Sequence, residues 1–242
     1  MNQTHITTYW ANFFGIPPTA FHQSGCRVLP HRQLAGFQGA WLYRRNNNII
    51  LSVPQEEVSL LAALVHQHPP TDKTLFSAPY IEYLFKDRVN KIIGPAFQGY
   101  YQALSGDPEE GPESVLRLDF AQHQETIKSL SQSGDPIGWD HSGVFKEKSI
   151  LYGYQYQGRI LALANYRLVD EQVGFIGVYT HPEFRGRGFG RATVKAALTD
   201  LARQGKTALY QTLHSNIASI AVANSLGIQE FASHVAVRLK TQ

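Results

Sequence analysis

Three glycines stand between a β-prone segment and a helical pattern, and this arrangement constrains the fold more than any other feature of the chain. Gly186, Gly188 and Gly190 alternate with larger residues. The β-prone segment Val173–Thr180 precedes them, and apolar residues at helical spacing follow over Thr193–Ala202. Glycine permits positive φ and close approach of a ligand to the backbone, and the unpaired amides at a helix start attract anions. We therefore expect a strand–loop–helix unit that binds a phosphate group.

Arg185, Arg187 and Arg191 add positive charge to this loop. A P-loop would end in Gly-Lys-Ser/Thr, and no such tripeptide follows Gly190. A dinucleotide-binding loop would carry Gly or Ala at position 191, where this chain has arginine. The segment is therefore predicted to cradle a pyrophosphate in another type of loop, and a purely structural turn is the alternative.

Composition restricts the class of protein. Of 242 residues, 43% are hydrophobic and 17% charged, which is typical of a globular chain. The net charge of +3 is too small to indicate a nucleic-acid partner. No apolar run of about 18 residues predicts a membrane span. The N-terminus does not resemble a signal peptide, and Cys26, the single cysteine, is expected to be structural, so we expect a cytoplasmic protein.

A polar, turn-rich stretch, Ser105–Glu113, is the expected boundary between two domains, residues 1–105 and 112–242. In the first domain, Ala40–Arg45 and Ile49–Val53 are predicted to form a hairpin about Asn46–Asn48. A helix is expected after Pro54 and a strand over Ile92–Gln102. This half shows no metal-ligand spacing and no nucleophile–base pair, so we expect it to pack or to serve the acceptor side.

The second half is predicted to alternate strands and helices in the order β-α-β-β-β-α-β-α-β. Besides the segments above, the expected elements are strands at 115–119, 151–155, 160–169, 209–213 and 235–239 and helices at 122–132 and 217–226. This order indicates antiparallel meander strands beside a parallel crossover. On the 193–202 helix we expect Lys195, Asp200 and Arg203 to face outward.

The run Arg185-Gly186-Arg187-Gly188-Phe189-Gly190 resembles the Arg/Gln-x-x-Gly-x-Gly/Ala loop of the Gcn5-related N-acetyltransferase (GNAT) superfamily. Downstream, Asn216–Ile228 is similar to the family's second motif, with an asparagine, a small residue three positions later and glycine before a hydrophobic residue. The resemblance covers about residues 115–242. It implies an α/β fold with a GNAT-like mixed, mostly antiparallel central sheet flanked by helices, joined here to an additional α/β N-terminal domain.

The resemblance also implies acetyl-CoA as cosubstrate, without a metal. The loop would hold the CoA pyrophosphate through Arg185, Gly186, Arg187, Gly188, Phe189, Gly190 and Arg191. Val178, Tyr179 and Thr180 would offer backbone hydrogen bonds to the pantetheine arm, where their strand splays from Leu209–Leu213. Asn216 and Ser219 would face the pantetheine end. Capping of its own helix is the alternative for Asn216, and packing is the alternative for Ser219.

Acetylation of an amine needs a base, since an amine with a pKa near 10 is mostly protonated at neutral pH. The family often uses a tyrosine as the acid for the departing thiolate, at the position that is Ala223 here. We expect His214 to be the base, with Tyr179 and Tyr210 as further catalytic candidates, and a plain loop role is the alternative for His214. The amide of Tyr179 or Thr180 would stabilise the oxyanion. Trp139 and His141 are expected to border the acceptor pocket, with a surface loop as the alternative.

The leading hypothesis is thus transfer of acetyl to a small-molecule amine, with no nucleic-acid or membrane partner. Acetylation of a protein or peptide is the second enzyme hypothesis. A CoA-binding regulatory module without catalysis is the hypothesis from another class, suggested by Ala223. The acceptor and the oligomeric state stay open at this level.

Overall fold

The computed structural model describes residues 3–101, 114–132, 135–144 and 150–240. These residues form two compact units, which are described separately. Unit 1 comprises residues 99–211 and 218–229, and unit 2 comprises residues 3–98, 212–217 and 230–240, within the described ranges. The expected domain boundary, Ser105–Glu113, lies outside the described residues.

The sheet of unit 1 has the predicted mixture of strand directions. Its strand order is β9-β8-β7-β6-β5. The strands are β5 (Val115–Leu118), β6 (Ile150–Tyr156), β7 (Arg159–Asp170), β8 (Val173–Thr180) and β9 (Thr207–Leu213). Neighbours pair antiparallel from β5 to β8, whereas β8 and β9, which are joined through α6 (Phe189–Arg203), pair parallel. The predicted fold class, a mostly antiparallel mixed sheet flanked by helices, is confirmed.

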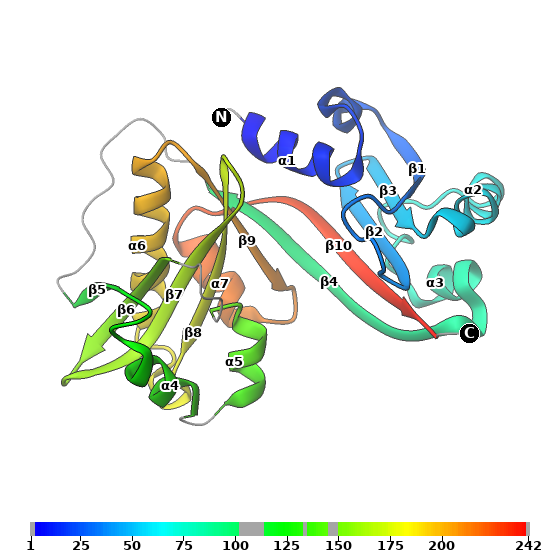
Figure 1. Cartoon of the computed structure of the whole chain (residues 1–242). Coiled ribbons are helices and arrows are strands. Elements are labelled where there is room, and N and C mark those ends of the chain that lie inside the picture. Colours follow the sequence, from blue (N-terminus) through cyan, green and yellow to red (C-terminus); the bar gives the residue numbers. More distant parts are fainter. Residues whose placement is uncertain (1–2, 102–113, 133–134, 145–149, 241–242) are drawn as a thin grey trace. The chain divides into compact units, whose positions relative to one another are not determined.

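Helices cover both faces of this sheet (Figure 1). On one face, α4 (Gln124–Gln132) and α5 (Pro136–Ser142) bury Ile127 and Trp139 against Leu163 of β7. On the other face lies α6, whose buried residues include Val194, Ala197, Leu198 and Leu201. The last helix of the unit, α7, spans Ile217–Ser225 and lies within the second motif, Asn216–Ile228.

Asp200 of α6 differs from the expectation that it faces outward. Its Oδ2 accepts hydrogen bonds from the hydroxyls of Tyr152 (2.7 Å) and Tyr166 (2.6 Å). Helical periodicity marked this position as polar, but two tyrosines on the facing strands supply partners that a sequence pattern does not reveal.

Unit 2 is also α/β, with the strand order β1-β3-β2-β10-β4. Its strands are β1 (Gly25–Pro30), β2 (Gly39–Arg45), β3 (Asn48–Val53), β4 (Val89–Tyr101) and β10 (Gln229–Leu239), and its helices are α1 (Thr4–Phe14), α2 (Val58–Gln67) and α3 (Ala78–Phe85). β10 pairs antiparallel with β2 over Ser233–Arg238. The α2 and α3 helices pack on an aliphatic core that includes Leu42 and Leu51.

The opposite face of unit 2 is aromatic. Trp10 of α1 lies 5.2 Å from Tyr43 of β2, and Phe13 lies 5.1 Å from Trp41, measured between ring centroids. The predicted hairpin between β2 and β3 is present, while α1, β1 and α3 were not predicted. No helix in the described ranges has the length and apolar character needed to cross a membrane.

Candidate functional site

The glycine loop has the backbone that the sequence predicts. After β8, a 3-10 turn over Pro182–Phe184 leads into the loop, and α6 begins at Phe189. Gly186 and Gly188 have φ of 77° and 82°, and a β-carbon on either would meet no atom within 4 Å. The loop therefore leaves open space beside the first turn of α6, whose amides have no partner within the helix. Open space next to the unpaired amides of a helix start fits a phosphate group.

The start of α6 approaches the end of β8 closely. A β-carbon on Gly190 would lie 2.6 Å from Oγ1 of Thr180. Phe189 stacks on Tyr154 of β6 at 4.2 Å between ring centroids, with an interplanar angle of 12°. These two contacts fix the helix start against the strands, so the amides of its first turn have a defined direction.

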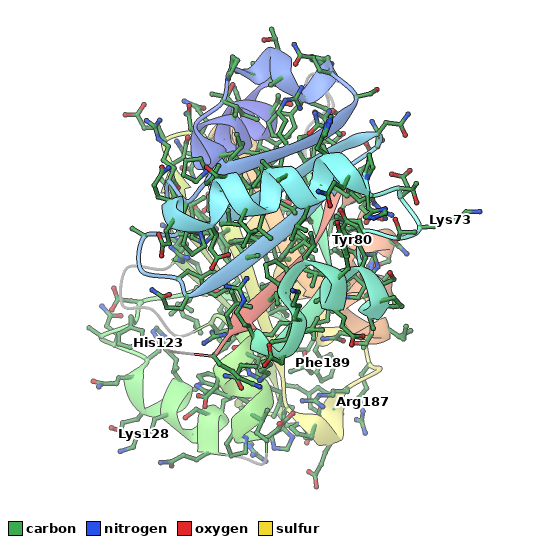
Figure 2. All side chains as sticks on the ribbon, turned by 90° about the vertical axis from the view of Figure 1, so that its right-hand side faces the viewer. Lys73, Tyr80, His123, Lys128, Arg187 and Phe189 are labelled. Atoms are coloured by element: carbon green, nitrogen blue, oxygen red, sulfur yellow. The ribbon has the colours of Figure 1, made fainter. Side chains whose placement is uncertain are left out.

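The three loop arginines have different surroundings. Arg185 donates from Nε to the carbonyl of Thr180 (3.3 Å) and forms an ion pair with Asp135 (2.5 Å). Arg191 donates to Oγ of Ser225 at the end of α7 (3.2 Å). Arg187 is exposed on the segment that leads into α6, with its guanidinium 5.0 Å from the ring centroid of Phe184 (Figure 2). Arg185 and Arg191 thus hold the loop to neighbouring helices, and Arg187 contributes exposed positive charge.

The end of β8 provides a second backbone site in the same unit, because its ladder with β9 stops before the strand does. The ladder between β8 and β9 runs from Val173–Thr207 to Ile176–Tyr210. Beyond Ile176, β8 continues to Thr180 and stays paired with β7, where Val178 and Thr180 face Ala164 and Ala162. The edge of residues 178–180 that faces β9 therefore lies beyond the ladder between β8 and β9, at the place where the sequence analysis expects the two strands to splay. An extended chain carrying amides can form strand-like hydrogen bonds at such an edge.

Tyr179 and Trp139 meet in the core of unit 1. Tyr179 is 3% exposed, and its ring lies edge-on to Trp139, 4.9 Å between centroids. Burial raises the pKa of Tyr179, so its hydroxyl is held in the protonated form. Trp139 and His141 both belong to α5, with Trp139 buried and His141 exposed. The structure brings Tyr179 and Trp139 together and directs His141 away from that core.

Tyr210 and Ser219 are also in contact. The hydroxyl of Tyr210 lies 2.6 Å from Oγ of Ser219, and Tyr210 is 2% exposed. Burial raises the pKa of Tyr210. Asn216 lies just before α7, and its backbone N–H donates to the carbonyl of Leu213. Ala223, where the family often has tyrosine, is fully buried in α7.

His214 lies in unit 2, in a polar cluster that the sequence did not predict. Its Nε2 is 3.3 Å from Oγ of Ser233 and 3.4 Å from Oε1 of Glu230. Ser233 in turn donates to Glu230 (2.6 Å). In the tautomer that carries the hydrogen on Nε2, the ring donates to these oxygens and Nδ1 has the lone pair that can accept a proton.

Asp135 is a further residue that sequence reasoning missed. It precedes Pro136 and caps α5, since its Oδ1 accepts from the N–H of Gly138 (2.8 Å). Asp followed by Pro at the first helical position is a helix-start signal, and this signal could have identified α5.

The sequence matches a known protein family over most of its second half. Residues 113–228 match the model of the acetyltransferase (GNAT) family, a span that contains the glycine loop, the splayed strands and α7. This segment belongs to the GNAT family. No curated protein matches the chain as a relative.

Two solved structures share the fold of this chain. An acetyltransferase from the GNAT family of Colwellia psychrerythraea matches with a TM-score of 0.54 and 12% identity, over 99% of this chain and 98% of its own. A GNAT-family protein from Novosphingobium aromaticivorans matches with a TM-score of 0.52 and 22% identity, over 64% of this chain and 68% of its own. At these identities the likeness concerns the fold alone.

Proposed function

We propose that the protein transfers the acetyl group of acetyl-CoA to a primary amine of a small molecule, by direct attack in a ternary complex. The observation that carries this proposal is that unit 1 contains two backbone sites. One is the open glycine loop at the start of α6, and the other is the β8 edge at residues 178–180, beyond its ladder with β9. A pyrophosphate joined to an amide-containing arm is a ligand that uses both.

In this proposal the amides of Gly186–Gly190 and the positive end of the α6 dipole bind the pyrophosphate, and Arg187 adds charge. The backbone of Val178–Thr180 binds the pantetheine amides. The attacking amine nitrogen forms the new C–N bond while the thioester C–S bond breaks. The oxyanion that develops in between accepts a hydrogen bond from the amide of Tyr179 or Thr180.

We further propose His214 as the base that takes the proton of the amine, with Glu230 and Ser233 holding its Nε2. Because Ala223 supplies no acid, the thiolate leaves without the family's usual tyrosine. Tyr179 and Tyr210 are the alternative acids, and burial raises the pKa of both hydroxyls. Asn216 and Ser219 are assigned to the pantetheine end, and Trp139 and His141 to the acceptor side.

The domain assignment is also a proposal: residues 112–242 carry acetyl transfer and residues 1–105 serve the acceptor side, in a cytoplasmic protein. A fragment of residues 112–242 is expected to bind CoA and to lose turnover. This fragment lacks β2, the partner of Ser233–Arg238, so it is expected to be less stable than the full chain. Full turnover in the fragment would remove the first half from the mechanism.

Release of CoA thiol from acetyl-CoA in the presence of a panel of amines tests the activity. The panel contains amino sugars, polyamines, amino acid amides and a lysine-containing peptide. We expect amine-dependent thiol release, with small amines better than the peptide. Binding of CoA without release for any amine would instead support the regulatory-module hypothesis, and preference for the peptide would support protein acetylation.

A further inference from the structure

The first residue of the glycine loop is tied to α5, a helix that precedes it by about fifty positions in the chain. Arg185 reaches the carbonyl of Thr180 with Nε and Oδ2 of Asp135 with Nη2. The guanidinium thereby joins the end of β8, the beginning of the loop and the start of α5. All three belong to unit 1.

Asp135 uses its two carboxylate oxygens for different purposes. Oδ1 caps α5 by accepting from Gly138, while Oδ2 is directed to Arg185. Gly138 is required for this geometry, since a β-carbon there would lie 2.3 Å from Oδ2. The hydrogen bond from Arg185, with that from the Gly138 amide, lowers the pKa of Asp135 and keeps it charged at neutral pH.

The α5 helix is itself fixed to the sheet, so Asp135 has a defined position. Its middle is held by the contact of Trp139 with Tyr179. Its end is held by Asn165 of β7, which donates to the carbonyl of Gly143 (3.0 Å). Gly177 of β8 permits this packing, because a β-carbon there would lie 2.5 Å from the carbonyl oxygen of Ser142. The position of Asp135 is thus fixed, through α5, relative to β8, the strand assigned to the pantetheine arm.

We propose that Asp135 is a positioning residue for acetyl-CoA, which acts by holding Arg185 and so fixing the start of the loop in its ligand-binding arrangement. This inference rests on the proposed function. A loop that is already ordered loses less conformational entropy when the ligand binds. The ion pair is partly exposed, with side-chain exposures of 51% and 28%, so its removal costs the folded state little. The effect is therefore expected in CoA affinity rather than in folding.

Calorimetric titration of CoA into the wild type, Asp135→Asn, Arg185→Gln and the double variant tests this inference. Asparagine is as good a helix cap as aspartate, so Asp135→Asn removes the charge and keeps the cap. Asp140→Asn is the matched control, the same change at an exposed position of the same helix. We expect Asp135→Asn to bind CoA about fivefold more weakly at low salt, a difference that shrinks at high salt. Asp140→Asn should match the wild type.

The double variant separates positioning from general weakening. If Asp135 acts through Arg185, the double variant binds no more weakly than Arg185→Gln alone. In turnover, Asp135→Asn should raise KM for acetyl-CoA by the same factor and leave kcat unchanged. Wild-type affinity in Asp135→Asn, or additive losses in the double variant, would overturn the inference while leaving the proposed function intact. A wild type that binds no CoA would overturn both.

Discussion

The hydroxyl of Tyr210 lies 2.6 Å from Oγ of Ser219, which joins two residues that the sequence assigned to different tasks. Tyr210, a catalytic candidate, lies on β9, and Ser219, a cofactor candidate, lies in the first turns of α7. Tyr210 is 2% exposed, and its hydroxyl connects β9 to α7 through this contact. Because the hydroxyl of Tyr210 is engaged with Ser219, it is poorly suited to deliver a proton to a leaving group. The imidazole of His214 is better suited to proton transfer, as the acceptor of the amine proton.

Tyr210→Phe is accordingly expected to change kcat by less than about threefold and to cost about 1 kcal/mol of stability, since one buried hydrogen bond is lost.

His214→Ala should lower kcat by roughly a hundredfold and leave the CoA dissociation constant nearly unchanged, because the imidazole acts on the amine. His22→Ala, a change at an exposed histidine of the same unit, is the control and should be silent. Full turnover in His214→Ala together with loss in Tyr210→Phe or Tyr179→Phe would transfer the proton-transfer role to that tyrosine.

Gly188→Asp should weaken CoA binding by roughly a hundredfold or more, by placing a side chain and a negative charge at the anion site. Gly158→Asp is a matched control: its φ is 75°, compared with 82° at Gly188, and a β-carbon at either position meets no atom within 4 Å. Both variants carry the same backbone strain, so the loop-specific effect is the difference in CoA affinity between them. Equal affinities would show that the loop is only a turn.

The sequence predicted the elements that depend on short stretches of residues and missed the contacts between residues far apart in the chain. The loop, the α6 helix and the β6–β7 hairpin follow from glycine positions and from periodicity within short windows. The seven-residue α5 was missed because it is too short to show a period and contains Gly138. The Asp135–Arg185 and Tyr152–Asp200 contacts join residues 50 and 48 positions apart, and local patterns carry no information on such pairs.

The strands of unit 2 show the same limit. β1 pairs parallel with β3, with register Gly25 to Asn48, although the two strands are separated by all of β2. The β1 strand has exposed residues at both ends and partly buried ones between them, without the alternation that identifies a strand from sequence. Its existence depends on the edge that β3 offers, which only the fold reveals.

Asp200→Asn should destabilise the protein by about 2 kcal/mol at pH 7, because the carboxylate accepts two tyrosine hydrogen bonds. Burial opposes the charge, but the bonds from Tyr166, Tyr152 and Gln204 outweigh it and lower the pKa of Asp200. A lowered folded-state pKa means that this contribution is present above the unfolded value of about 3.9 and is lost as pH falls through the folded value.

Urea unfolding of the wild type and Asp200→Asn at pH 7 and at pH 3 measures this dependence. The stability gap between the two proteins should narrow at the lower pH. Asp140→Asn, an exposed aspartate changed in the same way, should show little gap at either pH. A gap for Asp200→Asn that is as large at pH 3 as at pH 7 would contradict the assignment of the charge.

The most direct test of the whole account is calorimetric titration of CoA into the wild-type protein, with thermal unfolding of the same samples. A ligand that binds only the folded state at a hundred times its dissociation constant stabilises that state by about 2.7 kcal/mol. The account predicts a single binding site and a higher melting temperature in millimolar CoA. Absence of both the binding heat and the shift in melting temperature would contradict it.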